Sequence, residues 1–433
     1  MLERLQSNEA HIGVIGLGYV GLPLSMAFIE GGYRVTGFDI DAEKVAILSA
    51  NETYIQHIGG DAIKRMNESG RFVPSADFSL LAEVDAIVIC VPTPLKNGRE
   101  PDLGPVLNTG ETIAKHLQKG QLVVLESSTY PGTTDTELAG VLEQSGLTAN
   151  KDFYLAYSPE REDPGNLDFG TSRIPKLVGA DTPDALALAT ALYEGVISEV
   201  VPVSSARAAE AAKLTENTFR AVNIAMVNEL KVIFEKMDID VWDVIDAAAT
   251  KPFGYMPFYP GPGLGGHCIP IDPFYLTWKA RQHGVETRFI ELAGEINTDM
   301  PRYVVERLSA GLAKHEKSLK DAHILLIGIA YKKNIDDMRE SPALVLIELL
   351  EAAGAKVDFH DPHVPIIPNT REHAELAGRV SVGLETAAEA DAVLIVTDHD
   401  DVDYGFVADK AALVVDTRNA MRAHAGRGNI VKA

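Results

Sequence analysis

One succession of short apolar segments occurs twice in this chain, and it restricts the fold more than any other feature. "HIGVIGLGY" and "YRVTGFD" near the N-terminus return as "HILLIGIAY" and "AKVDFHD", and "DAIVICVPT" and "QLVVLES" return as "DAVLIVTDH" and "ALVVDTR". Short β-branched runs that alternate with helical segments are typical of a buried parallel sheet covered by helices on both faces. We therefore expect an α/β protein with two Rossmann-like doubly wound domains.

A long segment without glycine or proline separates the two copies. Residues 206–237 would form about nine turns of helix, which is longer than most helices of globular proteins. Such a helix could join the two domains and present a face to a second subunit, so we expect at least a homodimer or a higher homo-oligomer. A four-turn helix with a kink is the alternative.

The composition excludes several classes of protein. The chain has 433 residues, too many for one ordinary core, and a formal net charge of −23. This charge disfavours nucleic acid and membrane surfaces as partners, although a few basic residues in a cleft could hold a small anion. No apolar run reaches the roughly 20 residues of a membrane span, and the N-terminus lacks a signal-peptide pattern. Two cysteines fit a reducing cytoplasm rather than a disulfide framework.

The first copy carries a dinucleotide fingerprint. Gly16, Gly18 and Gly21 form G-x-G-x-x-G between a strand and a helix, and Asp39 closes the next strand. In this context the glycines permit a tight turn, approach of a pyrophosphate, and close packing of helix on strand. Asp39 would bind the ribose hydroxyls and disfavour a 2′-phosphate, so we predict NAD rather than NADP. A glycine turn without a ligand is the alternative.

The second copy has "KKNIDDMRESP" where the first has its glycines, so we expect it to have lost the fingerprint. In the first copy, Thr93 and Thr129 each end a strand, at the edge where open α/β sheets bind ligands. A cap or turn role is an equal alternative for each threonine.

Cys268 stands behind a run of glycines in "PGPGLGGHCIPIDP". Glycines offer backbone approach rather than side-chain packing, which favours a reacting thiol over a small buried hydrophobe; Cys90, inside an apolar strand, fits the latter. No second ligand pair at zinc spacing accompanies His267 and Cys268, so no metal site is expected.

A nucleophilic thiol needs a partner that lowers its pKa. Asp272 lies four residues on, and Lys213 is a better cation if the fold brings it near. Lys213 shares one helix face with Asn217, four residues later, and with Glu210. A solvated helix lysine is the alternative for Lys213.

"YSPEREDPGN" follows the apolar run "FYLA". Glu160 and Arg161 in this segment could reach a ligand from the strand end, and a surface turn is the alternative.

Taken together, these residues resemble the UDP-glucose/GDP-mannose dehydrogenase family of nucleotide-sugar 6-dehydrogenases. The resemblance runs from about His11 to about Arg418 and rests on the order of "GLGYVGLP", "VPTP", "SPER", "EAAKLTENTFR", "GGHCIPIDP" and "YKKNIDDMRESPA". It implies an NAD-binding domain over 1–200, a central helical and dimerisation domain with the cysteine loop over 201–305, and a UDP-binding Rossmann-like domain over 306–433.

The resemblance also implies a mechanism. The sugar C6 alcohol is oxidised to an aldehyde, captured by Cys268 as a thiohemiacetal, oxidised to a thioester and hydrolysed to a carboxylate. Lys213 would stabilise the oxyanion, Asp272 would activate water or orient Lys213, Glu160 would take part in acid–base work, and Asn217 would contact substrate or oxyanion.

The binding residues implied by the resemblance fall into two sets. The NAD-binding positions are Gly16, Gly18, Tyr19, Val20, Gly21, Asp39, Lys44, Thr93 and Thr129. The substrate-binding positions are Arg161, Lys213, Asn217, Tyr259, Gly263, Gly265, Lys332 and Arg339.

The motifs "SPEREDPGN" and "GGHC" look more like the N-acetylhexosamine branch of the family. They favour UDP-N-acetylglucosamine as substrate, with UDP-N-acetylmannosamine or UDP-glucose as alternatives. A non-catalytic protein that binds NAD and a UDP-sugar is the alternative of a different class. Lys251 is the basic residue nearest to the position from which glucose-specific members reach a neighbouring subunit.

Overall fold

The computed structural model describes residues 1–55, 58–96, 100–161, 173–266, 269–369 and 373–433. Two compact units make up the chain, each formed by two stretches of sequence. The first unit comprises Met1–Glu216 and Phe274–Glu286, and the second comprises Asn217–Pro273 and Thr287–Ala433.

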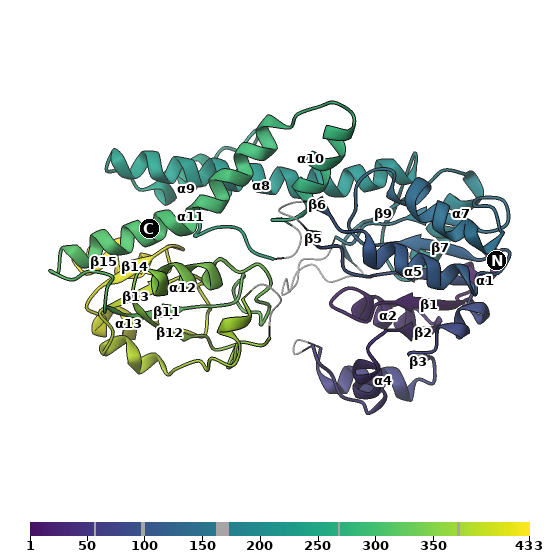
Figure 1. Cartoon of the computed structure of the whole chain (residues 1–433), viewed down its shortest axis with the longest axis horizontal. Coiled ribbons are helices and arrows are strands. Elements are labelled where there is room, and N and C mark those ends of the chain that lie inside the picture. Colours follow the sequence, from purple (N-terminus) through teal and green to yellow (C-terminus); the bar gives the residue numbers. More distant parts are fainter. Residues whose placement is uncertain (56–57, 97–99, 162–172, 267–268, 370–372) are drawn as a thin grey trace. The chain divides into compact units, whose positions relative to one another are not determined.

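The first unit is built on an eight-stranded sheet in the order β10-β9-β8-β7-β4-β1-β2-β3 (Figure 1). All neighbouring strands are parallel except β8 and β9, which are antiparallel. The strands are β1 (His11–Ile15), β2 (Arg34–Phe38), β3 (Phe72–Ser75), β4 (Ala86–Ile89), β7 (Leu122–Leu125), β8 (Tyr154–Tyr157), β9 (Lys176–Ala180) and β10 (Val200–Val203). A separate antiparallel pair joins β5 (Leu95–Lys96) to β6 (Glu100–Pro101).

Helices cover both faces of this sheet because its strands are apolar on both sides. Val88 of β4 packs in one core cluster, while Ile87 and Ile89 pack in another. The first cluster holds residues of α2 and α7, and the second holds residues of α5 and α6. The helices that lie entirely in this unit are α1 (Leu2–Gln6), α2 (Gly21–Glu30), α3 (Ala42–Ser49), α4 (Gly60–Glu68), α5 (Gly104–Ala114), α6 (Ala139–Leu142) and α7 (Pro183–Glu194).

The second unit repeats the arrangement on a smaller parallel sheet in the order β12-β11-β13-β14-β15. Its first four strands take the places that β2, β1, β4 and β7 take in the first unit, as the duplicated sequence predicts. The elements are β11 (His323–Ile327), α12 (Pro342–Ala352), β12 (Lys356–His360), β13 (Ala392–Ile395), α13 (Tyr404–Lys410), β14 (Val414–Asp416) and β15 (Ile430–Lys432). The predicted fold class is confirmed.

The predicted long helix is a single α-helix, α8 (Ala206–Lys236), of 31 residues. The alternative of a four-turn helix is therefore wrong. The remaining helices are α9 (Val241–Ala249), α10 (Asp272–Gln282) and α11 (Arg288–Ala313). None of the described helices is both long and apolar enough to cross a membrane. The oligomeric state and the three predicted domain ranges stay predictions.

Candidate active site

The glycine turn after β1 has the geometry that a dinucleotide requires. Gly16 has φ +92°, and a Cβ there would lie 2.5 Å from the carbonyl oxygen of Cys90. A Cβ at Gly21 would lie 1.9 Å from the carbonyl oxygen of Gly16, whereas a Cβ at Gly18 would meet none of the described residues within 4 Å. Gly16 and Gly21 are therefore required by packing, and Gly18 leaves open space. These residues fit a bound pyrophosphate over the turn and the N-terminus of α2.

Asp39 lies directly after β2 and is 7% exposed. Its carboxylate accepts hydrogen bonds from the backbone N–H groups of Leu17 and Asp41, each at 3.0 Å. The ammonium of Lys44 lies 3.9 Å from the same carboxylate and 5.6 Å from the centre of the Tyr54 ring. Each carboxylate oxygen keeps acceptor capacity after one such bond, which fits the hydroxyls of a ribose.

The strands β4 and β7 end at Ile89 and Leu125, so the two predicted threonines follow these strands rather than ending them. Thr93 and Thr129 are 2% and 0% exposed. The hydroxyl of Tyr275 donates to the backbone oxygen of Thr93 at 2.9 Å, and that of Thr129 bonds Thr133.

Cys90 also lies just past β4 and is half-buried, so its expected place inside the strand is wrong. The apolar run of the sequence continues past Ile89, where β4 ends, and the N–H of Cys90 still donates to the backbone oxygen of Ile15 at 2.8 Å.

Glu160 and Lys213 come together in the first unit. The ammonium of Lys213, a residue that is 4% exposed, donates to the backbone oxygen of Glu160. Lys213 is thus not a solvated helix lysine, and that alternative is wrong. Arg161 forms a two-pronged pair with Glu216, at 2.8 and 3.3 Å, and donates to the backbone oxygen of Pro175.

Glu210, one turn before Lys213, serves the loop after β7. Its carboxylate accepts from the backbone N–H groups of Gly132 at 2.7 Å and Thr134 at 2.9 Å, and from the Thr134 hydroxyl at 2.7 Å. Burial raises the pKa of Glu210 to about 7, although these donors oppose the shift. Glu210 therefore ties α8 to the loop that follows Thr129.

In the second unit, the side-chain amide of Asn217 donates to the carboxylate of Asp272, the first residue of α10. Both side chains are buried, and the guanidinium of Arg220 donates to the amide oxygen of Asn217. Cys268 and His267 lie outside the described residues. The predicted catalytic roles of these residues stay predictions.

The glycine loop before Cys268 packs closely in the second unit. The N–H of Gly261 donates to the side chain of Asn228 at 3.0 Å, and a Cβ at Gly261 would lie 2.4 Å from the guanidinium of Arg418. A Cβ at Gly265 would lie 2.6 Å from the Cβ of Tyr331, so this position excludes any larger residue.

Two further predicted residues of the same loop are Gly263, which is buried, and Tyr259, which is exposed. Gly263 has φ +140°, and its Cβ position lies 3.2 Å from Pro342. Tyr259 is 48% exposed, and its hydroxyl bonds Asp246 at 2.8 Å.

The predicted basic residues of the second copy follow β11. Lys332 is half-buried, and Arg339 is exposed. The guanidinium of Arg339 pairs with Asp337 at 2.6 Å, while its backbone oxygen accepts from Gly266 at 3.0 Å. Arg339 is thereby joined to the loop that leads to Cys268.

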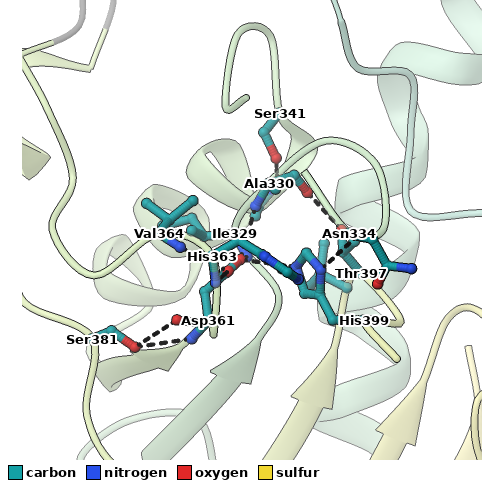
Figure 2. A network of polar contacts seen from close by, with 12 residues as sticks. Ile329, Ala330, Asn334, Ser341, Asp361, His363, Val364, Ser381, Thr397 and His399 are labelled. Atoms are coloured by element: carbon teal, nitrogen blue, oxygen red, sulfur yellow. Dashed lines mark hydrogen bonds and ion pairs between the residues drawn. The ribbon is translucent and has the colours of Figure 1, made fainter. Parts of the chain in front are cut away.

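The strand-end aspartate of the second copy is fully engaged within the protein (Figure 2). Asp361 follows β12 as Asp39 follows β2. One of its oxygens accepts from the N–H groups of Ile329 at 2.7 Å and Ala330 at 3.1 Å and contacts His399 at 3.0 Å. Its other oxygen accepts from His363 and Val364, at 2.8 and 3.0 Å.

These contacts accompany the loss of the dinucleotide fingerprint in the second copy. Burial would raise the pKa of Asp361, but His399 and the backbone donors together lower it, so the carboxylate stays charged and occupied. Gly328 keeps the positive φ of Gly16, at +81°, but buried Ala330 stands where the first copy has Gly18.

Sequence reasoning missed two parts of the structure. Arg418, which follows β14, lies against the glycine loop, and its Nε donates to the backbone oxygen of Val396 at 2.9 Å. A buried pair of Glu126 and Lys176 lies behind Glu160. In each case the sequence shows a charged residue near a strand end, but it does not show which other residue the charged side chain contacts. No group of three or more metal-ligating side chains occurs among residues that the structure describes.

The fold and the glycine turn define a dinucleotide-dependent enzyme of the Rossmann class. Three family models cover nearly the whole chain: the NAD binding domain of the UDP-glucose/GDP-mannose dehydrogenase family matches residues 10–197, its central domain 207–299, and its UDP binding domain 325–423. The chain belongs to this family, and it is an NAD-dependent UDP-sugar dehydrogenase. The predicted family and cofactor are confirmed.

The relatives act on more than one sugar. The chain is 37% identical to a UDP-N-acetyl-D-glucosamine 6-dehydrogenase of Pseudomonas aeruginosa over 90% of this chain and 91% of that protein. It is 35% identical to a UDP-N-acetyl-D-mannosamine dehydrogenase of Salmonella typhimurium over 90% and 94% of the two chains. A solved UDP-D-ManNAc dehydrogenase from Pyrococcus horikoshii matches with a TM-score of 0.88 at 32% identity, covering 98% of each chain.

Proposed function

We propose that this dehydrogenase oxidises the C6 alcohol of UDP-N-acetylglucosamine to the carboxylate. The observation that carries this proposal is the 37% identity to a UDP-N-acetyl-D-glucosamine 6-dehydrogenase along nearly the whole chain. UDP-N-acetylmannosamine is the second candidate, and the relatives from Salmonella typhimurium and Pyrococcus horikoshii favour it.

Cys268 is the proposed nucleophile. Its sulfur adds to the C6 aldehyde, and the sugar stays attached as a thiohemiacetal and then a thioester until water releases the acid. Bound NAD supplies the hydride acceptor for each of the two oxidations, held by the glycine turn, Asp39 and Lys44.

Lys213 is the proposed stabiliser of the oxyanion that forms at C6. Its burial supports this role, because an ammonium in a site with little water acts more strongly on a developing charge. Asn217 is proposed to contact the same oxygen or the substrate. Asp272 would orient Asn217 through their hydrogen bond and help to activate water.

Glu160 is the proposed acid–base residue for the attack of water on the thioester. Its side chain is 16% exposed, which leaves it accessible to a water molecule. Thr93, Thr129, Tyr19 and Val20 complete the proposed cofactor contacts.

The UDP moiety is proposed to lie against the glycine loop and the second Rossmann-like copy. Tyr259, Gly263, Gly265, Lys332 and Arg339 are the residues assigned to it, with Arg161 nearer the sugar. We retain the domain ranges 1–200, 201–305 and 306–433, a homodimer or higher homo-oligomer, and a cytoplasmic location as parts of this proposal.

The test is a substrate panel followed by NADH absorbance. UDP-N-acetylglucosamine, UDP-N-acetylmannosamine, UDP-N-acetylgalactosamine and UDP-glucose are each supplied with NAD, and kcat/KM is compared. The proposal expects the highest value for UDP-N-acetylglucosamine and about two NADH per sugar, as a four-electron oxidation requires. A higher kcat/KM for UDP-N-acetylmannosamine would select the second candidate, and one NADH with accumulating aldehyde would exclude the thioester step.

A further inference from the structure

A buried cation, Lys176, lies close to the carboxylate of Glu160 in the first unit. Lys176, the first residue of β9, is 6% exposed. Its ammonium donates to the carboxylate of Glu126 at 2.8 Å and lies 3.8 Å from the carboxylate of Glu160. One lysine thus faces two carboxylates.

Glu126 holds this lysine from the opposite side. It follows β7 and is 0% exposed, and its second oxygen accepts a hydrogen bond from the hydroxyl of Tyr193 on α7. The ammonium of Lys176 lies 5.1 Å from the centre of the Tyr193 ring, within range of a cation–π interaction. Contacts from β7, β9 and α7 therefore fix the position of the lysine.

The charges of this cluster keep Lys176 protonated. Burial opposes its charge and is the largest single influence, but the two carboxylates outweigh burial and raise the pKa of Lys176. Cys90 and Tyr193 are the other titratable groups that interact with Lys176 and Glu126.

Two other basic residues near Glu160 have different partners. Lys213 on α8 donates to the backbone oxygen of Glu160, and Arg161 is paired with Glu216. Lys176 is thus a cation that the described contacts place beside the Glu160 carboxylate.

We propose that Lys176, held in place by Glu126, is a positioning residue that orients the Glu160 carboxylate for its role as a base. This inference rests on the proposed role of Glu160. At 3.8 Å the lysine attracts the carboxylate through its charge, without a short hydrogen bond to it. A neighbouring cation lowers the pKa of a carboxyl group, and a neighbouring anion raises it.

Two substitutions should therefore move the acidic limb of the kcat–pH profile in opposite directions. Lys176→Met removes the cation, and the midpoint of the acidic limb should move to higher pH by about one unit or more. Glu126→Gln removes an anion that competes for Lys176, so that Lys176 faces Glu160 alone. The midpoint of the acidic limb should then move to lower pH. A residue with a purely structural role would not produce opposite shifts.

The experiment measures kcat and KM from about pH 5 to about pH 9 with NAD and the better substrate of the panel. Lys176→Arg retains the charge and should keep the acidic limb close to that of the parent. Lys119→Met is the matched control, because Lys119 is an exposed lysine of the same unit, paired with Asp152 at 3.0 Å.

Lys176→Met could fail to fold, because it leaves Glu126 buried without its cation. The double variant Lys176→Met/Glu126→Gln removes both charges, and the midpoint of its acidic limb should lie at a higher pH than that of Glu126→Gln alone. Thermal unfolding and NAD binding verify that each variant is folded. Unmoved limbs, or limbs that move in the same direction, would overturn the inference.

Glu160→Gln separates this inference from the proposed function. It should lower turnover and abolish the acidic limb that the other variants move. If Glu160→Gln keeps both turnover and the limb, the proposed role of Glu160 is wrong and the inference falls with it. If Glu160→Gln abolishes the limb while the Lys176 and Glu126 variants leave it unmoved, the inference alone is wrong.

Discussion

The side chains of Asn217 and Asp272 are hydrogen-bonded to one another, although they are 55 positions apart in the sequence. Arg220, which can only donate, bonds the amide oxygen of Asn217 and so directs its NH₂ group toward the Asp272 carboxylate. The two residues are 0% and 1% exposed. The orientation of a proposed substrate-contacting amide thus depends on an aspartate at the start of another helix.

Asp272→Asn should lower kcat by about 10²-fold while NAD affinity stays unchanged, because it removes the charge that orients Asn217. Steady-state kinetics and an NAD titration check this prediction. Asp299→Asn, an exposed substitution on α11, is the control. Equal losses in kcat and in NAD affinity would indicate a general loss of structure instead.

Cys268→Ser should reduce turnover at least about 10³-fold and leave NAD binding intact, since a hydroxyl is a poorer nucleophile near neutral pH. The chain has two cysteines, so Cys90→Ser provides a matched control. NADH formation measures turnover, and quenching of intrinsic fluorescence measures NAD binding. Near-normal turnover of Cys268→Ser would remove Cys268 from the mechanism.

Gly18→Ala and Gly21→Ala should separate cofactor binding from folding. A methyl group at Gly18 meets open space and should leave the melting temperature unchanged, yet weaken NAD about tenfold or more by occupying the approach to the pyrophosphate. A methyl group at Gly21 would lie 1.9 Å from a backbone oxygen and should destabilise the first unit. Calorimetry and NAD titration distinguish the two effects, and unchanged NAD affinity of Gly18→Ala would contradict the assigned turn.

Lys231→Met should stabilise the second unit near neutral pH. Lys231 is 3% exposed, and its ammonium has no hydrogen-bond partner among the described residues, although it lies 5.3 Å from the Trp242 ring centre. Burial lowers the pKa of Lys231 to about 7, with Asp416 opposing the shift. Between about pH 7 and the ordinary lysine pKa of 10.5, the unfolded chain binds a proton that the folded chain has lost. The free energy of unfolding of the parent protein, which carries Lys231, therefore rises with pH in this range by about 1.4 kcal/mol per pH unit.

The gain in unfolding free energy from Lys231→Met should shrink as the pH rises toward 10.5 and level off above it, where the amine of the parent is neutral in both the folded and the unfolded chain. Urea unfolding followed by Trp242 fluorescence in a Trp278→Phe background tests the trend, since the chain has two tryptophans. Lys236→Met, at an exposed position of the same helix, is the control. A gain independent of pH would show that Lys231 is not neutral in the folded protein.

The fold was predictable because its signals are local. Each strand is a short apolar run, the glycine turn stands between a strand and a helix, and the two copies share one strand order. Strand ends were less predictable, since an apolar run such as that around Cys90 continues past the last strand residue, Ile89.

Much of the candidate site could not be predicted, because it depends on pairs of distant residues. Glu126 and Lys176 are 50 positions apart, and each resembles an ordinary charged residue at a strand end. Arg418 looked equally ordinary, and only the structure places it against Gly261. Sequence spacing indicates neighbours along a helix or strand, but it does not indicate which strand ends meet.

The closed carboxylate of Asp361 has a consequence for the order of events during catalysis. With that aspartate satisfied internally, the described part of the chain offers a single dinucleotide fingerprint, at Gly16–Gly21. Under the proposed chemistry, both hydrides must be transferred to NAD bound at that one site. The first NADH must therefore dissociate and a fresh NAD arrive while the half-oxidised sugar is still attached to Cys268. The lifetime of the tethered sugar is then set by cofactor exchange, so trapping it should be easiest when NAD is scarce.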